Sequence, residues 1–438
     1  MQAETLINAR WIIPVEPANT VLEYHSIAIA DGRIKAILPT SEATTQITAE
    51  KVIDLPQHAL IPGLINAHTH APMSLFRGLA DDMPLMSWLS DHIWPAEAKW
   101  IHEEFIADGS RLAIAEMLRS GTTCFNDMYF FPDITGHVAA KSGIRAVVGL
   151  ILIDFPSAWA KDAEDYLAKA IEVHDQFRND PLINSAFAPH APYSVSDEPL
   201  QRMLTLDNEL EIPIHMHVHE TQDEVSQGIK NHGMRPISRL KKLGLINPSL
   251  LAVHMTQLND EEIDDFALGG AQIVHCPESN LKLASGFCPV NKLLDAGINV
   301  ALGTDSAASN NDLDMLGEMK TAALLGKGIT QDASVLPAHQ VLEMATINGA
   351  KALGLEDQTG SLQVDKEADI VAINLGNITT QPVYNPISQI IYAAGRDQIS
   401  DVWVAGRQQV ANGILLNMDE SAIIATASHW AERIAVND

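Results

Sequence analysis

The sequence contains little cysteine, little basic charge and no long apolar run. Three cysteines occur among the 438 residues, and Cys124, Cys276 and Cys288 are widely spaced. A sparse and odd set excludes a disulfide framework and fits reduced thiols, so we expect a cytoplasmic protein. The N-terminal residues do not form a basic segment followed by an apolar stretch, so no signal peptide is expected. No uninterrupted apolar stretch reaches the ~20 residues that span a membrane.

Acidic residues outnumber basic residues. The chain has 28 lysines and arginines against 56 aspartates and glutamates, which gives a net charge of −28. Such a surface repels nucleic acids and anionic membranes, so we expect neither as a partner. Hydrophobic residues make up 46% of the chain, enough for one large domain and a smaller one.

The apolar pattern changes twice along the chain. Short apolar bursts flank Asp31-Gly32, a hairpin signal, and β-like segments return after about residue 360. Between them, short apolar strands alternate with amphipathic segments such as 97–120 and 223–243, which indicates parallel pairing. The predicted strands lie near residues 60–70, 122–128, 145–154, 183–190, 211–219, 250–256, 271–276 and 298–305. We therefore predict a (β/α)8 barrel over residues 60–359 and a β-sandwich from residues 1–59 and 360–438, the latter including a C-terminal helix.

Histidines and one aspartate follow several predicted strands. The first strand ends in His68-Thr69-His70, and alternation along a strand points both rings to the same side. The fifth carries His217 close to its end, the sixth ends at His254, and Asp305 follows the eighth. The carboxyl ends of all eight strands meet at one mouth of a barrel. Nitrogen and carboxylate ligands around an open position are typical of a catalytic zinc site.

Each of these residues also has a structural interpretation. His215 shares a strand face with His217 and is expected to be a hydrogen-bonded interior histidine. His254 alone would be a packing residue, and Asp305 alone would cap a helix. Their joint placement at strand ends favours the metal site. The sequence has no H-E-x-x-H helix and no P-C-x-x-C partner for an H-x-E, which excludes two other classes of zinc enzyme.

These motifs resemble the amidohydrolase superfamily over nearly the whole chain. The superfamily motifs are Pro62–His70, Gly303–Ser306, Gly360–Leu362 and Lys366–Val371. Within it, the chain is similar to the 5-methylthioadenosine/S-adenosylhomocysteine deaminase family. The segments that carry this second resemblance are Ala71–Asp82, Pro84–Trp88, Pro95–Glu97, Ala188–Tyr193 and His275–Gly286.

The resemblance implies a metal-dependent barrel that deaminates adenosine-type nucleosides. The expected reaction converts 5′-methylthioadenosine to 5′-methylthioinosine and ammonia, with S-adenosylhomocysteine and adenosine as further substrates. It implies one divalent metal ion per subunit, Zn²⁺ first, although nitrogen and oxygen ligands also suit iron and manganese. The implied metal ligands are His68, His70, His217 and Asp305. We also expect a homo-oligomer, the common state of soluble assemblies.

The resemblance further implies roles around the metal. Glu220 would protonate purine N1, His254 would orient the attacking water, and Asp305 would carry the water's proton to the departing ammonia. Glu220 and Asp305 would therefore both contact substrate. Trp88 would pack on the nucleoside, Glu97 would accept from the ribose hydroxyls, and His190 would contact the purine. The structural alternatives are a core tryptophan at Trp88 and a helix-terminal glutamate at Glu220.

One loop departs from the family pattern. Some members bind the homocysteine carboxylate with arginines, but residues 154–162 here contain none. This favours methylthioadenosine and adenosine, with Met73, Leu75 and Met86 around the thioether tail. The alternatives are a deaminase of a free base or triazine, such as guanine, cytosine or a chlorotriazine, and a non-catalytic binding barrel. The full set of expected ligands argues against a binding barrel.

Overall fold

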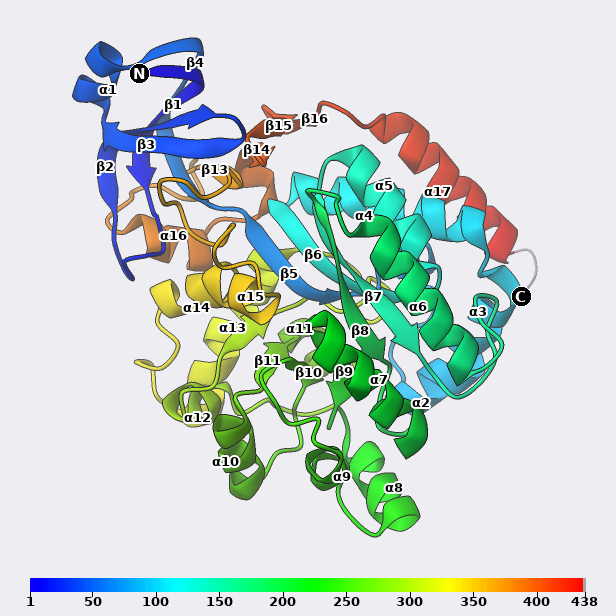
Figure 1. The fold of residues 1–438 in the computed structure, drawn as a ribbon. Helices are drawn as coiled ribbons and strands as arrows, with labels where there is room; N and C mark the ends of the chain where they lie inside the picture. Colours follow the sequence, from blue (N-terminus) through cyan, green and yellow to red (C-terminus); the bar gives the residue numbers. More distant parts are fainter. Residues whose placement is uncertain (436–438) are drawn as a thin grey trace. The chain divides into compact units, whose positions relative to one another are not determined.

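The computed structural model describes residues 1–435 (Figure 1). The chain divides into two compact units. Unit 1 comprises residues 1–66, 115–124 and 314–419. Unit 2 comprises residues 67–114 and 125–313, and it includes the chain from Glu420. The domain boundaries after residues 59 and 359 remain a prediction. None of the helices within residues 1–435 combines the length and apolar character of a membrane span.

Eight strands form a nearly closed barrel in which each strand neighbours its successor in the sequence. They are β5 (Leu64–Thr69), β6 (Thr122–Tyr129), β7 (Arg145–Leu152), β8 (Ile183–Pro189), β9 (Ile214–Val218), β10 (Leu250–His254), β11 (Gln272–His275) and β12 (Val300–Leu302). The ladders from β7 to β12 are parallel. Nearly every residue of these strands is buried, as expected for a sheet covered on both faces. The predicted barrel is confirmed.

A glycine lets the last strand approach the first. The backbone N–H of Asp305 donates to the carbonyl of His68 over 3.0 Å, and the hydroxyl of Thr69 donates to the carbonyl of Asp305 over 3.0 Å. A Cβ placed on Gly303 would lie 2.8 Å from the backbone nitrogen of His68. Only glycine fits this approach, which brings Asp305 beside the β5 histidines.

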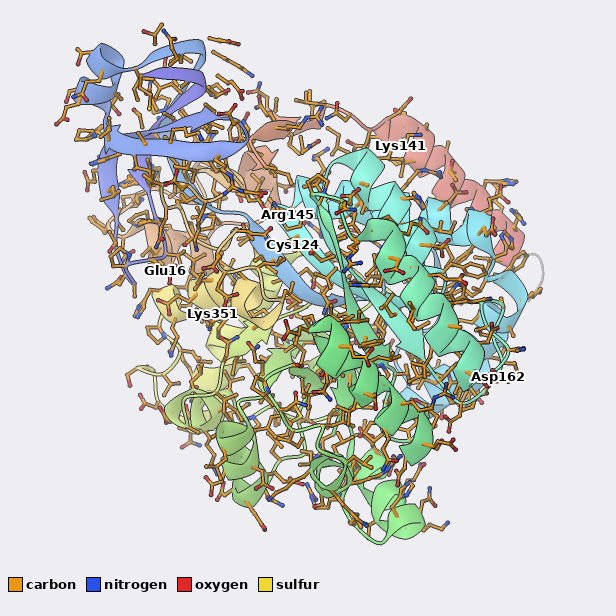
Figure 2. All side chains as sticks on the ribbon, in the orientation of Figure 1. Glu16, Cys124, Lys141, Arg145, Asp162 and Lys351 are labelled. Carbon is orange, nitrogen blue, oxygen red and sulfur yellow. The ribbon has the colours of Figure 1, made fainter. Side chains whose placement is uncertain are left out.

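Helices follow most of the barrel strands. They are α5 (Pro132–Ser142), α6 (Ala163–Phe177), α7 (Asp197–Leu210), α8 (Gln222–His232), α9 (Pro236–Leu243), α10 (Asp260–Gly269), α11 (Pro277–Lys282) and α12 (Val290–Asp295). Both α5 and α6 pack on β7, and α7 packs on β8 (Figure 1). Asp162 begins α6 as an N-cap that accepts from the N–H of Asp165 over 2.9 Å (Figure 2). The buried residues of α6 recur at helical spacing, which explains why this segment forms an amphipathic helix.

Two predicted amphipathic segments are each divided in the structure. The segment 223–243 forms α8 and α9, because Gly233 takes a left-handed conformation with φ 71° and Pro236 starts a new helix. The segment 97–120 forms α3 (Trp94–Trp100) and α4 (Glu103–Arg119). Before them the chain forms η1 (Ala71–Phe76), α2 (Leu85–Ser87) and η2 (Trp88–Ile93), and near the C-terminus it forms α17 (Glu420–Ala435).

A second sheet of eight strands in unit 1 combines both ends of the chain, as predicted. Its strands are β1 (Gln2–Ile12), β2 (Leu22–Ala30), β3 (Arg33–Pro39), β4 (Thr48–Pro62), β13 (Ile370–Asn374), β14 (Ile399–Val404), β15 (Arg407–Ala411) and β16 (Ile414–Leu415). Asp31 and Gly32 both have positive φ and connect β2 to β3, so the hairpin prediction is confirmed. The helices of this unit are α1 (Thr40–Gln46), α13 (Met315–Thr330), α14 (Ala338–Met344), α15 (Ile347–Ala352), α16 (Pro386–Tyr392) and η3 (Arg396–Gln398).

The apolar run before His68 is two strands, not the single strand that the pattern predicts. Residues up to Pro62 belong to β4, where Leu60 pairs with Ala372 of β13. Gly63 separates β4 from β5, and a Cβ there would lie 1.9 Å from the hydroxyl oxygen of Thr123. The close approach of Thr123 therefore requires glycine at the point where the chain passes from one sheet to the other.

Candidate active site

Three histidines and one aspartate converge at the carboxyl ends of β5, β9 and β12. Atoms offered by His68, His70, His217 and Asp305 all lie within 4.8 Å of one another. The Oδ1 of Asp305 is 3.3 Å from Nε2 of His68 and 3.2 Å from Nε2 of His70. The Nε2 atoms of His217 and His68 are 3.3 Å apart. The structure thus brings together all four residues predicted as ligands.

Backbone carbonyls fix how two of these rings face the centre. The Nδ1 of His70 is 2.5 Å from the carbonyl oxygen of Met128, and the Nδ1 of His217 is 2.8 Å from that of His190. A carbonyl oxygen only accepts, so each Nδ1 carries the hydrogen and each Nε2 is left to bind a cation. His215 lies 2.8 Å from Nδ1 of His68, which confirms that it is a hydrogen-bonded interior histidine.

The electrostatics of the cluster favour a positive ion. Burial lowers the pKa of His68 to about 3 and that of His217 well below its ordinary value, so both rings are neutral ligands near pH 7. Burial opposes ionisation of Asp305, but the neighbouring rings of His68 and His70 outweigh it and hold its pKa well below the usual range. Burial lowers the pKa of His70, but the neighbouring Asp305 raises it by more. The net result is a pKa above the ordinary value for histidine. The lone pairs of the histidine rings and the ionised carboxylate of Asp305 lie around one point. Such a set of donors suits one divalent metal ion.

The second oxygen of Asp305 is held by serines that the sequence analysis did not select. Ser279 and Ser309 donate their hydroxyls to Oδ2 over 2.6 and 2.9 Å, and the N–H of Ser306 donates to Oδ1 over 2.7 Å. Ser279 lies inside the segment His275–Gly286 that carries the family resemblance, but nothing in its spacing indicates this contact.

Glu220 and His254 face each other beside the metal-ligand cluster. The Nε2 of His254 is 3.8 Å from Oε2 of Glu220. The other ring nitrogen, Nδ1, donates to Oδ1 of Asn280 over 2.9 Å, which leaves Nε2 directed toward Glu220. Burial raises the pKa of Glu220 more than His254 lowers it, which favours the protonated carboxyl group relative to an exposed glutamate.

Left-handed backbone conformations gather at these strand ends. His219, His254, Met255 and Asp305 have φ values of 52°, 75°, 52° and 61°. Residues other than glycine adopt this region at a cost of about 1–3 kcal/mol, and such strain occurs often at functional sites. It is found here where three of the predicted site strands end.

His190 and Glu97 lie close to the cluster. The ring of His190 is 5.0 Å from that of His217, and burial lowers its pKa to about 4. Glu97 accepts the hydroxyl of Tyr129 over 2.7 Å, and burial raises its pKa to about 7. The ring of Tyr129 is in turn 6.3 Å from that of His70.

The side chain of Trp88 is buried, whereas an aromatic residue that stacks on a substrate needs an accessible ring face. Its side chain is 5% exposed, its indole N–H donates to the carbonyl of Ala80 over 3.1 Å, and it packs in a core cluster with Met73 and Phe76. The structure therefore gives Trp88 a packing role, and contact with substrate remains a prediction.

Loops that follow several barrel strands expose apolar side chains. Met86, Phe155 and Tyr193 follow β5, β7 and β8 and are 38%, 53% and 42% exposed. In the segment after β11, the Nζ of Lys282 donates to Oδ1 of Asp81 over 2.6 Å. Exposed apolar side chains thus occur in segments that follow these barrel strands, and the ring of Tyr193 lies 5.8 Å from that of His190.

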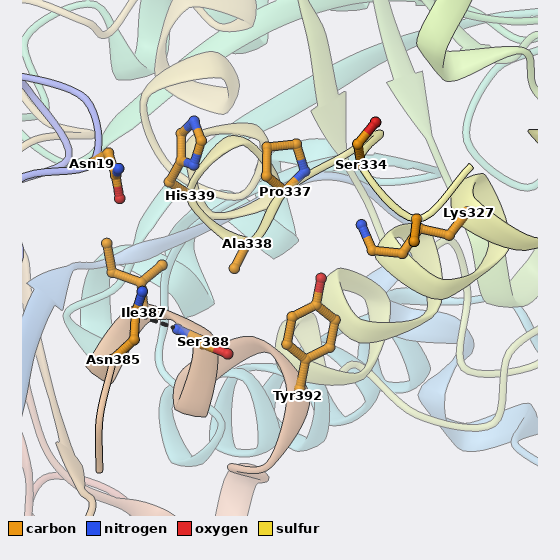
Figure 3. Close-up of a pocket in the computed structure, with 11 residues that line it drawn as sticks. Asn19, Lys327, Ser334, Pro337, Ala338, His339, Asn385, Ile387, Ser388 and Tyr392 are labelled. Atoms are coloured by element: carbon orange, nitrogen blue, oxygen red, sulfur yellow. Dashed lines mark hydrogen bonds between the residues drawn. The ribbon is translucent and has the colours of Figure 1, made fainter.

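A separate pocket of about 400 Å³ lies within unit 1, where α13, α14 and α16 contribute to its lining (Figure 3). Lys327, His339 and Tyr392 are among its lining residues, which include no aspartate, glutamate or cysteine. Its one imidazole has no carboxylate partner in the lining, so this pocket lacks the mixed donor set of a hydrolytic metal site. The barrel end is the better candidate for the chemistry.

Comparisons with known proteins agree with this geometry. A profile of the Amidohydrolase family matches residues 59–408. A protein of Saccharophagus degradans named 5-methylthioadenosine/S-adenosylhomocysteine deaminase is 49% identical, with 99% of this chain and 97% of that protein covered. A protein of the same name from Teredinibacter turnerae is also 49% identical, with 98% and 97% covered. A crystal structure described as an adenosine deaminase from Xanthomonas campestris with bound zinc has a TM-score of 0.98 and 51% identity, with 99% of both chains covered.

Proposed function

Because the chain belongs to the amidohydrolase family, we propose that it hydrolytically deaminates adenosine-type nucleosides, with 5′-methylthioadenosine as the main substrate. The products are 5′-methylthioinosine and ammonia. The observation that carries this proposal is the group His68, His70, His217 and Asp305 with Glu220 beside it. The names of the similar deaminases support the substrate, and the zinc in the similar crystal structure supports Zn²⁺ as the metal.

The metal supplies one part of the chemistry. A divalent zinc ion lowers the pKa of a bound water from about 15.7 to about 7, which provides a nucleophile at neutral pH. His68, His70, His217 and Asp305 would hold this ion. Asp305 would accept a proton from the attacking water, and the two serine hydroxyls on Oδ2 would hold its carboxylate in place meanwhile.

Glu220 would supply the proton that the purine needs. As water adds to C6, the C6–N1 double bond becomes single and N1 gains a proton from the buried Glu220 carboxyl group. His254, with Nε2 toward the same space, would orient the attacking water. Asp305 would then pass its proton to the amino group, the C6–N bond would break, and ammonia would leave. The C6 hydroxyl group would return its proton to Glu220 as it becomes the carbonyl of the product, which regenerates the acid. An acid at this position favours release of an amine from a purine.

The ribose and the 5′ substituent decide between substrates. Glu97 would accept both ribose hydroxyls, since a carboxylate offers two acceptor oxygens. Exposed Met86 and Phe155 favour an apolar methylthio group, and the loop 154–162 has Lys161 as its one basic residue. A homocysteine carboxylate would find no arginine there. We therefore propose methylthioadenosine and adenosine ahead of S-adenosylhomocysteine.

An ammonia-release screen of the zinc-loaded protein tests this proposal. The substrates are methylthioadenosine, adenosine, S-adenosylhomocysteine and guanine, each at the same concentrations. We expect the highest kcat/KM with methylthioadenosine and no turnover of guanine. Turnover of free bases or triazines without turnover of nucleosides would contradict the proposal and favour the second candidate, a free-base or triazine hydrolase.

Two further features belong to the same proposal. Cys124, Cys276 and Cys288 are buried, and none of them forms a disulfide in the described part of the chain, which suits a reducing cytoplasm. We also propose a homo-oligomer, and light scattering of the purified protein would measure its mass. A mass of one chain would contradict this part alone.

A further inference from the structure

The carboxylate of Glu224 binds the backbone next to Glu220 with both of its oxygens. Oε1 accepts the N–H of His219 over 2.9 Å, and Oε2 accepts the N–H of Glu220 over 2.7 Å. Glu224 is buried, at 7% exposure, and lies in the first turn of α8, where Thr221 is the N-cap. The arrangement joins the first turn of this helix to the loop that carries the proposed acid.

This contact extends beyond ordinary helix capping. In a capping box, a glutamate at the third helical position bonds the backbone N–H of the N-cap residue. Glu224 occupies that third position, but its two oxygens reach the N–H groups one and two residues before the N-cap Thr221. The bonds therefore organise the loop after β9 as well as the start of α8.

The loop needs such support because its backbone is strained. His219 has φ 52°, a left-handed conformation that a histidine adopts at a cost of about 1–3 kcal/mol. Thr256, after β10, donates its hydroxyl to the carbonyl of Glu220 over 2.7 Å. Glu220 is thus held at its N–H by Glu224 and at its carbonyl by Thr256.

We propose that Glu224 is a positioning residue for proton transfer, because it fixes the peptide from which the Glu220 side chain extends toward His254. The inference rests on the proposed function, in which Glu220 donates a proton to the substrate. Among the hydrogen bonds and ion pairs of residues 1–435, Glu224 has none with His68, His70, His217 or Asp305. Its loss would move the carboxyl group of Glu220 relative to the reacting nitrogen, and a misplacement of about 1 Å costs on the order of 100-fold in rate.

A double-mutant cycle with Glu224→Gln and Glu220→Gln tests this role. Glutamine keeps the size of the side chain, but its NH₂ group faces an N–H donor and cannot accept from it. In the wild-type background we expect kcat to fall about 10- to 100-fold, with KM and metal content nearly unchanged. In the Glu220→Gln background the same change should cost less than about 3-fold, because the residue through which it acts is already disabled. Equal losses in both backgrounds would overturn the proposal.

Amide hydrogen exchange gives a readout that does not depend on the substrate. In Glu224→Gln, the amides of His219 and Glu220 should exchange at least about 10-fold faster than in the wild type, while amides in β9 stay protected. Unchanged exchange at both positions would overturn the proposal. If the wild type turns over none of the screened nucleosides, the proposed function fails, whereas faster exchange would still support the loop-fixing contact.

Control and rescue variants separate positioning from general stability. Asn385→Ala removes the side-chain N-cap of α16 in unit 1, where it accepts the N–H of Ser388 over 3.1 Å, and should leave kcat unchanged. If Glu224→Gln does not fold, Glu224→Asp goes through the same cycle, because it keeps the charge but is one methylene too short to reach both amides. A kcat loss in Asn385→Ala as large as that in the Glu224 variant would indicate a stability effect and overturn the proposal.

Discussion

The hydroxyl of Ser279 donates to Oδ2 of Asp305 over 2.6 Å, while Oδ1 of the same carboxylate faces the imidazoles of His68 and His70. The two oxygens therefore have separate partners. One faces the metal-ligand cluster and the other is fixed by hydroxyl donors. A carboxylate that both binds a metal and carries a proton benefits from being held in a single orientation.

Removal of the Ser279 hydroxyl should loosen this carboxylate. We expect Ser279→Ala to lose about 10-fold in kcat/KM or in zinc affinity, the usual effect of losing a hydrogen bond to a metal ligand. The loss should stay moderate because Ser309 still donates to Oδ2. Steady-state kinetics and zinc titration measure it, with the exposed Ser428→Ala as the control. Wild-type values for both quantities would show that Ser309 alone suffices.

Glu220→Gln should separate metal binding from turnover. Among the hydrogen bonds and ion pairs of the described residues, none joins Glu220 to His68, His70 or His217. The zinc content should therefore remain near one per chain. The kcat should fall about 100- to 10,000-fold, the range for loss of a general acid. Metal analysis and ammonia release on the same sample measure both effects. Retention of wild-type turnover would remove Glu220 from the mechanism.

Nucleoside binding should depend on the ionisation of Glu97. Burial raises its pKa to about 7, so the carboxylate is protonated below this pH and ionised above it. An ionised carboxylate accepts two ribose hydroxyls, whereas a protonated one loses acceptor capacity. We therefore expect KM for methylthioadenosine to decrease as the pH rises from 6 to 8.

A matched substrate isolates this effect. The 2′-deoxy analogue removes one of the two hydroxyls, so its KM should change less over the same range. In Glu97→Gln, the KM of both substrates should no longer show a step in its dependence on pH near pH 7. A step that persists in Glu97→Gln would assign the pH dependence to another group.

The barrel strands, and the grouping of His68, His70, His217 and Asp305, could be predicted because both leave a local signal. Apolar runs mark buried strands, and His68, His217 and Asp305 lie at or just beyond the ends of such runs. The carboxyl-end rule for barrels then brings them together without any knowledge of the packing.

Contacts between distant segments could not be predicted in the same way. Ser279 is an ordinary helix-terminal residue in the sequence, and its partner Asp305, 26 positions later, is defined only by the approach of loops from different strands. The division of the first apolar run at Gly63 was missed for a similar reason, since the close neighbour, Thr123, is 60 positions away in the sequence. Periodicity reports which side of an element is buried, and it carries no information about which hydrogen bond a polar side chain makes.

The approach of β12 to β5 predicts that Gly303→Ala damages the site through the backbone. The added methyl would lie 2.8 Å from the backbone nitrogen of His68 and 2.9 Å from its Cβ, so the strand ends must separate. Overpacking of this kind costs about 1–3 kcal/mol, and the shift of Asp305 away from His68 should also weaken zinc binding. Gly328→Ala is the control, because Gly328 lies inside α13 with open space around it and should gain about 0.5–1 kcal/mol. Denaturant unfolding and zinc titration of both variants measure the difference, and equal stability of the two would contradict the close approach at Gly303.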